Sequence, residues 1–95
     1  MRVKVSEEVR SFLRTLAPVP RRMILRELHK IERSEREPEP LEHPLEDFCK
    51  IRAGGYRILC VIEGGTVFAL FADRRSIVYE VASAALLEGI ARRLR

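Results

Sequence analysis

Over the first 16 residues, the spacing of apolar side chains changes once, from two residues to three or four. Val3 and Val5 alternate with cations in MRVKV, which predicts a short strand over residues 1–5 with one buried face. Beyond Ser6 the spacing is that of an amphipathic helix. The apolar positions of this helix are Val9, Phe12, Leu13 and Leu16. Ser6 is the expected N-cap, because its hydroxyl can accept a hydrogen bond from the first helical turn.

A second helix is expected directly after the first. Pro18 cannot continue the first helix, whereas Pro20 suits the opening turn of the next one. A second apolar stripe then ends near Ser34. Its members are Ile24, Leu28 and Ile31. Residues 6–34 are therefore predicted to form a helical hairpin.

The segment EREPEPLEHP, residues 35–44, differs in composition from the rest of the chain. Its three prolines and four glutamates exclude a helix and disfavour a strand, so we expect a solvated connection. Beyond this segment the pattern becomes that of strands, predicted over residues 48–53, 56–62 and 66–72. Gly-Gly pairs separate them, and such pairs suit tight hairpin turns because these turns need positive φ.

The C-terminal quarter predicts one more strand and a helix. SIVYEV, residues 76–81, has strand character, and ASAALLEGIARRLR, residues 82–95, is helical by composition with a cationic end that suits the helix dipole. The expected order is β-α-α-β-β-β-β-α. We therefore predict a single α+β domain over residues 1–95. In it, an N-terminal strand and a helical hairpin pack on a small, mostly antiparallel sheet, with a C-terminal helix.

Composition narrows the class of protein. A chain of 95 residues that is 46% hydrophobic can build one modest core. Its apolar runs fall short of the roughly 18 residues that a membrane span needs. The start, MRVKVSEEVR, has charges where a signal peptide would be apolar, so we expect a cytoplasmic protein without a membrane partner. The net charge of +4 leans toward nucleic acid or an acidic protein as partner.

The two cysteines do not form a disulfide framework of the kind that small secreted domains use. A two-residue turn at Gly54-Gly55 would place Cys49 directly opposite Cys60, so a cross-strand bridge is geometrically allowed. In a reducing cytoplasm, however, we expect two small, partly buried thiols. A zinc site is not expected either, because the chain has no Cys-x-x-Cys pair.

The same turn gathers cations on one face of the sheet. It pairs Arg52 with Arg57 and Lys50 with Leu59. The opposite face, expected against the helices, carries Ile51, Ala53, Tyr56 and Ile58. Like charges directly opposite each other destabilise a strand pair by roughly 0.2–1 kcal/mol. Either an anion or acidic partner uses these cations, or they solvate an exposed face.

The second hairpin extends this face. With Gly64-Gly65 as its loop, the face continues through residues 68, 70 and 72 toward Arg74, and DRRSIVYE adds Arg75 and Tyr79. Arginines fork onto phosphate oxygens and a tyrosine ring can stack on a base, so this composition suits a ribose-phosphate backbone. The alternatives are a core tyrosine at position 79 and a surface salt bridge from Arg75 to Asp73 or Glu80.

Residues 45–80, LEDFCKIRAGGYRILCVIEGGTVFALFADRRSIVYE, resemble the C-terminal half of the RelE/ParE superfamily of bacterial toxin–antitoxin toxins. Two motifs carry the resemblance, GYRI at residues 55–58 and RSIVY at residues 75–79. The short first strand and the helical hairpin suit the same architecture, so the resemblance extends over nearly the whole chain.

The RelE branch implies a ribosome-dependent mRNA endoribonuclease, or mRNA interferase, that inhibits translation and arrests growth. The implied reaction is attack of a ribose 2′-OH on the adjacent phosphate, which needs no metal and no other cofactor. By motif position, Arg57 would stabilise the charge on the phosphate and Lys50 would be the acid–base group. Arg75 and Tyr79 complete the implied catalytic set. Arg52 and Arg74 are expected to bind RNA.

The resemblance also implies partners. These are the ribosome with its mRNA and a cognate antitoxin that covers the cations with an acidic or partly disordered segment; no small-molecule ligand is expected. Two alternatives remain. The chain could be a ParE-like toxin that inhibits DNA gyrase without nuclease activity, or an inactive relic that still binds an antitoxin.

Overall fold

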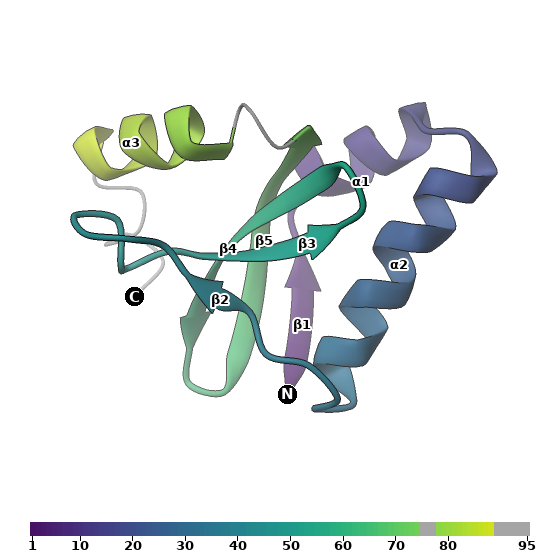
Figure 1. Ribbon diagram of the computed structural model, residues 1–95, viewed down its shortest axis with the longest axis horizontal. Helices are drawn as coiled ribbons and strands as arrows, with labels where there is room; N and C mark the ends of the chain where they lie inside the picture. The colour runs from purple at the N-terminus through teal and green to yellow at the C-terminus, as the bar shows by residue number, and fades with distance from the viewer. Residues whose placement is uncertain (75–77, 89–95) are drawn as a thin grey trace.

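A computed structural model describes residues 1–74 and 78–88 of the chain (Figure 1). Its elements are β1 Arg2–Val5, α1 Glu7–Thr15, α2 Pro18–Glu32, β2 Glu39–Pro40, β3 Cys49–Ala53, β4 Tyr56–Glu63, β5 Thr66–Arg74 and α3 Val78–Glu88. The strands form one sheet in the order β1-β5-β4-β3-β2. β1 runs parallel to β5, and the other neighbours are antiparallel. The predicted α+β fold with a mostly antiparallel sheet is confirmed.

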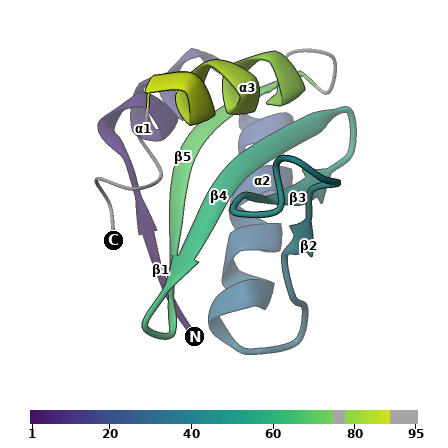
Figure 2. The same cartoon turned by 90° about the vertical axis from the view of Figure 1, so that its left-hand side faces the viewer.

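The sheet separates two hydrophobic clusters. α1 and α2 cover one face of the sheet and α3 lies across the other, as Figure 2 shows. On the α1–α2 side, the buried helical residues are Val9, Ile24, Leu28 and Ile31, and they pack on Ile51, Ile58 and Val67. On the α3 side, Ala82 packs in a cluster with Leu41, Phe48, Leu59 and Val61. β4 is therefore buried on both faces, whereas β3 is buried on its α1–α2 face only.

The helical hairpin forms as predicted, and polar side chains define its corners. Ser6 caps α1, since its Oγ accepts a hydrogen bond from the Val9 amide at 3.1 Å. The same hydroxyl donates to the Leu70 carbonyl at 2.8 Å, which ties the start of α1 to β5. Arg21 of α2 donates to the carbonyls of Leu13 and Leu16 at 3.0 and 2.7 Å. Both carbonyls lie at the C-terminal end of α1, where the hydrogen-bond ladder of the helix runs out.

Two expectations are wrong, although the order of elements is the one predicted. The strand expected over residues 76–81 does not form, because residues 78–81 lie in α3; residues 76 and 77 lie outside the described part of the chain. β1 already occupies the edge of β5 that this strand would need. The additional strand is instead β2, inside the proline-rich segment, where Glu39 pairs with Lys50 and Pro40 with Cys49. A proline is tolerated there because β2 is an edge strand.

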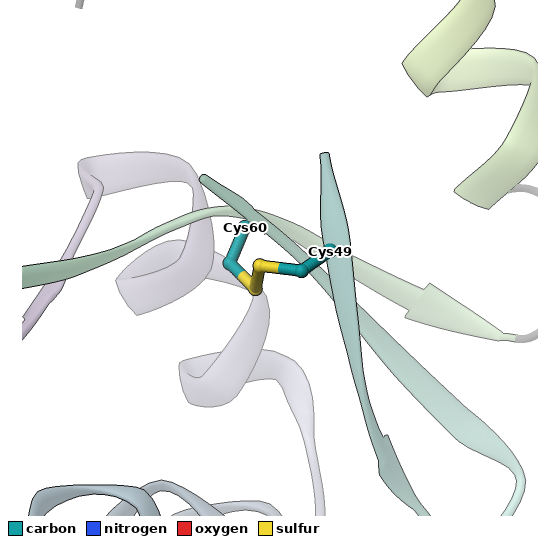
Figure 3. The surroundings of a disulfide bond; sticks show 2 residues. All are labelled: Cys49 and Cys60. Atoms are coloured by element: carbon teal, nitrogen blue, oxygen red, sulfur yellow. A yellow bond between two sulfur atoms is a disulfide. The ribbon is translucent and has the colours of Figure 1, made fainter. Parts of the chain in front are cut away.

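A disulfide joins Cys49 of β3 to Cys60 of β4 (Figure 3). The two residues are register partners with their Cα atoms 5.1 Å apart, and both are buried in the cluster beneath α1 and α2. The expectation of two separate thiols is therefore wrong. The two-residue turn at Gly54-Gly55, which places Cys49 opposite Cys60, forms as expected. Within residues 1–74 and 78–88, no helix is long and apolar enough to cross a membrane.

Replacing both Cys49 and Cys60 with alanine should lower the free energy of unfolding by about 3 kcal/mol, because the bridge closes a short loop in the unfolded chain. The expected change in thermal denaturation is a fall in Tm of roughly 10 °C or more. A reductant present during heating should lower the Tm of the wild type, because unfolding exposes the bridge, and should leave the double variant unchanged. Two reactive thiols in the unreduced, denatured wild type would contradict the bridge.

Gly54→Ala should destabilise the protein by more than about 1 kcal/mol, whereas Gly55→Ala serves as its matched control. Gly54 has φ of +59°, and a Cβ added there would lie 2.6 Å from Met23 Cε. Gly55 has neither a positive φ nor a neighbour within 4 Å of such a Cβ. Urea denaturation of the two variants measures the difference. Equal stabilities would show that the Gly54 conformation does not constrain the turn.

Candidate functional site

The β3–β4 hairpin holds three cationic side chains on the α3 face of the sheet. Ala53 pairs with Tyr56 across the turn, which places Arg52 opposite Arg57 and Lys50 opposite Leu59, as predicted. Side chains alternate between the two faces of a strand. The three cations therefore share a face with Leu59, whose side chain belongs to the hydrophobic cluster under α3.

Tyr79 reaches the same place from the first turn of α3. Lys50 Nζ donates a hydrogen bond to Tyr79 Oη at 2.8 Å and lies 5.4 Å from the centre of the ring. Tyr79 remains 45% exposed, so it is not the core tyrosine considered as an alternative. A phenol that accepts from an ammonium and keeps an exposed ring can contact a ligand through either feature.

Four side chains line one open cleft of about 300 Å³ at this end of the sheet. They are Lys50, Arg52, Arg57 and Tyr79. Among the described residues, this lining contains three cations, one hydroxyl and no carboxylate. Anionic groups such as phosphates are the ligands that this composition favours.

Arg57 is anchored to the turn beside it. Its Nη1 donates to the carbonyls of Gly54 and Tyr56, each at 2.8 Å. These two bonds orient the guanidinium along the end of the hairpin, and neither of these two acceptors carries a charge. A preorganised cation of this kind can stabilise negative charge without first reorganising.

Strand β5 meets β4 through a register shift between Leu59 and Cys60, which corrects one prediction. A continuous ladder would have put Arg74 on the face of the cations. The shift instead pairs Asp73 with Arg57 and Arg74 with Tyr56. One extra residue in a strand transfers every later side chain to the opposite face, so Arg74 lies on the side of α1 and α2. Arg75, the other arginine considered, lies outside the described residues.

Two charged residues of the proline-rich segment were missed in the sequence. Glu39 Oε1 lies 3.4 Å from Arg52 Nε. Arg36 Nη1 donates to the Arg52 carbonyl at 2.7 Å, and its Nη2 lies 4.0 Å from the same Glu39 oxygen. A segment assigned as a solvated connection gave no reason to place either residue beside the sheet. The pairing of β2 with β3 brings them there.

Glu27 of α2 fixes Arg36 from the other side. It contacts Arg36 Nη1 through Oε1 and Lys30 Nζ through Oε2, the latter at 3.1 Å. Burial acts to raise the pKa of the Glu27 carboxyl, but the hydrogen bonds and charges of Lys30 and Arg36 outweigh burial and lower it. The carboxylate therefore stays ionised at neutral pH and links α2 to the edge of the cleft.

The two histidines take no part in the cleft. His43 Nδ1 lies 2.7 Å from Glu46 Oε1, and His29 Nε2 lies 3.9 Å from Glu32. Both histidine side chains are largely exposed. Within the described parts of the chain, no three His, Cys, Asp or Glu side chains are grouped so that they could hold a metal ion.

Comparison with known proteins identifies relatives by structure. No protein-family model matches the sequence, and no curated protein matches it either. Among solved structures, the toxin–antitoxin complex RelBE2 from Mycobacterium tuberculosis contains a chain that is 26% identical, with a TM-score of 0.64; the match covers 78% of this chain and 96% of that one. The RelB–RelE antitoxin–toxin complex from Methanococcus jannaschii gives a TM-score of 0.63 at 16% identity, covering 81% and 95%. The resemblance to the RelE/ParE superfamily is thus confirmed at the level of the fold.

Glu27→Gln should destabilise the protein by about 1–3 kcal/mol at neutral pH, because its charge-assisted hydrogen bonds to Lys30 and Arg36 are lost. The folded state lowers the Glu27 pKa below its ordinary value of 4.5. The wild-type advantage should therefore be complete above that value and disappear as the pH falls through the lower folded pKa. Thermal denaturation from pH 3 to 7 tests this, with exposed Glu37→Gln as the control. A difference that does not change with pH would contradict it.

Proposed function

We propose that this chain is the toxin of a toxin–antitoxin module and that it cleaves mRNA on the ribosome. The clustering of Lys50, Arg52, Arg57 and Tyr79 in one cleft carries the proposal. The similarity to chains of RelBE complexes supports a toxin–antitoxin toxin. A cleft with three cations and a phenol adds groups that can bind a phosphate and stack on a base.

In the proposed reaction, a ribose 2′-OH attacks the adjacent phosphorus and forms a 2′,3′-cyclic phosphate. The 5′ oxygen leaves, and the 2′ proton passes to water in the open cleft. Arg57 stabilises the negative charge that develops on the phosphate oxygens, since its guanidinium is already held by two carbonyls. Lys50 gives a proton to the departing 5′ oxygen. Arg52 cannot do so readily, because a guanidinium does not deprotonate in proteins.

Tyr79 and Arg52 hold the RNA on either side of the reacting phosphate. The exposed ring of Tyr79 stacks on a base next to the cut, while its hydroxyl orients Lys50 through their hydrogen bond. Arg52 binds a neighbouring phosphate. Arg75 is retained as a proposed catalytic residue on the strength of its motif alone.

The ribosome would supply what the cleft lacks. Positioning of the 2′-OH in line with the leaving oxygen accounts for a large part of such a barrier, and an open cleft of four side chains does little of this alone. The antitoxin partner follows from the same charges. An acidic segment laid over Lys50, Arg52 and Arg57 would block RNA by occupying its phosphate contacts.

We place this activity in the cytoplasm. The disulfide is compatible with that compartment, because thiol attack on a disulfide requires access to its sulfur atoms. Cys60 is fully buried and Cys49 is 5% exposed, so the bridge lies out of reach of soluble reductants in the folded protein.

Arg57→Ala should lower the rate of cleavage roughly 100- to 1,000-fold, because it removes the preorganised charge at the phosphate. The measurement is to induce the protein in a bacterial host and map new mRNA 5′ ends.

Tyr79→Phe should reduce cleavage less than Arg57→Ala in the same measurement, since it removes the hydrogen bond to Lys50 and keeps the ring.

Arg26→Ala is the matched control, because Arg26 is an exposed arginine of α2 and is absent from the residues that line the cleft. It should cleave like the wild type. Growth arrest without new 5′ ends would reject the nuclease and favour a gyrase-directed toxin. The absence of any arrest would favour the inactive relic.

A further inference from the structure

We propose that Arg36 is a positioning residue of the RNA cleft, acting through Glu39 on the guanidinium of Arg52. This inference rests on the function proposed above and adds to it a residue that does not line the cleft. Four side chains of alternating charge run from α2 to the cleft in the order Glu27, Arg36, Glu39 and Arg52. Arg36 occupies the centre of this row, and its side chain is only 24% exposed.

Arg36 first fixes the main chain of Arg52. Across a two-residue turn, the partners Ala53 and Tyr56 form a hydrogen-bonded pair, so Arg52 and Arg57 form the next, non-hydrogen-bonded pair. The Arg52 carbonyl therefore points away from β4, toward the edge of the sheet. β2 pairs with Cys49 and Lys50 and stops short of this carbonyl. Arg36 Nη1 takes the place of a strand there, donating at 2.7 Å.

Arg36 also sets the charge that Arg52 presents. Glu39 Oε1 lies between the two arginines, 3.4 Å from Arg52 Nε and 4.0 Å from Arg36 Nη2. One carboxylate shared by two guanidiniums cannot neutralise both. If Arg36 were absent, the whole charge of Glu39 would act on Arg52, and a phosphate would have to compete with it. Arg36 therefore reduces the hold of Glu39 on Arg52 and leaves the Arg52 guanidinium available to the cleft.

Arginine suits this position better than lysine. Its planar fork donates to the Glu27 carboxylate and the Arg52 carbonyl at once and still faces Glu39. A lysine ammonium is a point donor without a fork, and it could keep the charge near Glu27 but not all three contacts. The role thus depends on geometry as well as on charge.

The test measures binding of a 2′-O-methyl single-stranded RNA of 12 nucleotides, which lacks the attacking hydroxyl, by fluorescence anisotropy. Arg36→Ala should weaken binding about fivefold, more than the loss of one remote charge would. Arg33→Ala is the matched control. It removes the same charge three residues away, from an exposed arginine that pairs with Glu35. It should change binding less than about twofold. Equal losses in the two variants would overturn the proposal.

A double-mutant cycle separates positioning from general destabilisation. In an Arg52→Ala background, Arg36→Ala should weaken binding no more than Arg33→Ala does, because Arg36 has nothing left to position. A fivefold loss that persists without the Arg52 side chain would overturn the proposal. Arg36→Lys keeps the charge and serves where the alanine variant folds poorly. It should bind RNA as weakly as Arg36→Ala, and wild-type affinity in this variant would show that charge alone is needed.

The NMR signal of the Arg52 Nε–H group tests the positioning role of Arg36 independently of RNA binding. If wild type and Arg57→Ala bind the RNA equally, the RNA cleft itself is wrong. The Nε–H signal, assigned by its loss in Arg52→Ala, should still shift on Arg36→Ala and stay in place on Arg33→Ala. An Nε–H signal that Arg36→Ala leaves unchanged would overturn the positioning role directly.

Discussion

The cleft and the bridge beneath it both depend on the register of the β3–β4 hairpin. The turn at Gly54-Gly55 pairs Ala53 with Tyr56, and side chains alternate outward from that pair. One face then receives the cysteine pair and the core beneath α1 and α2, while the other receives the cations. A shift of one residue would bury Lys50 and Arg52 against the helices. The disulfide fixes the same register at the end of the hairpin that lies away from the turn.

This register could be predicted because a glycine pair between two strands identifies its turn in the sequence. The register of β4 with β5 could not be predicted. Its irregularity lies between Leu59 and Cys60, two residues with no conformational signature, and it depends on how the strand fits between two packed faces. The consequence reaches the cleft, because Asp73 rather than Arg74 stands opposite Arg57. Cross-strand placement is reliable only as far as the ladder is continuous.

Tyr79 shows that a site residue can be identified while its secondary structure is misassigned. The motif pointed to the residue, but strand propensity gave it the wrong element, since β1 from the other end of the chain had taken the edge of β5. Arg36 and Glu39 show the opposite case. Their segment was bounded correctly by its prolines, yet no local pattern indicates that it lies along β3. Edge pairing is a long-range choice, and local sequence carries little information about it.

Three cations on one small face would repel each other if each had only water as a partner. The acceptors around them differ in kind: Arg57 donates to two carbonyls, Lys50 donates to a phenol, and Arg52 lies beside a carboxylate. Neutral acceptors satisfy hydrogen bonds and leave the charge in place, whereas the carboxylate reduces it. Since a second arginine shares that carboxylate, the face keeps most of its positive potential. The hairpin can therefore hold these cations in place through acceptors that are mostly neutral, and it still attracts anions to this face.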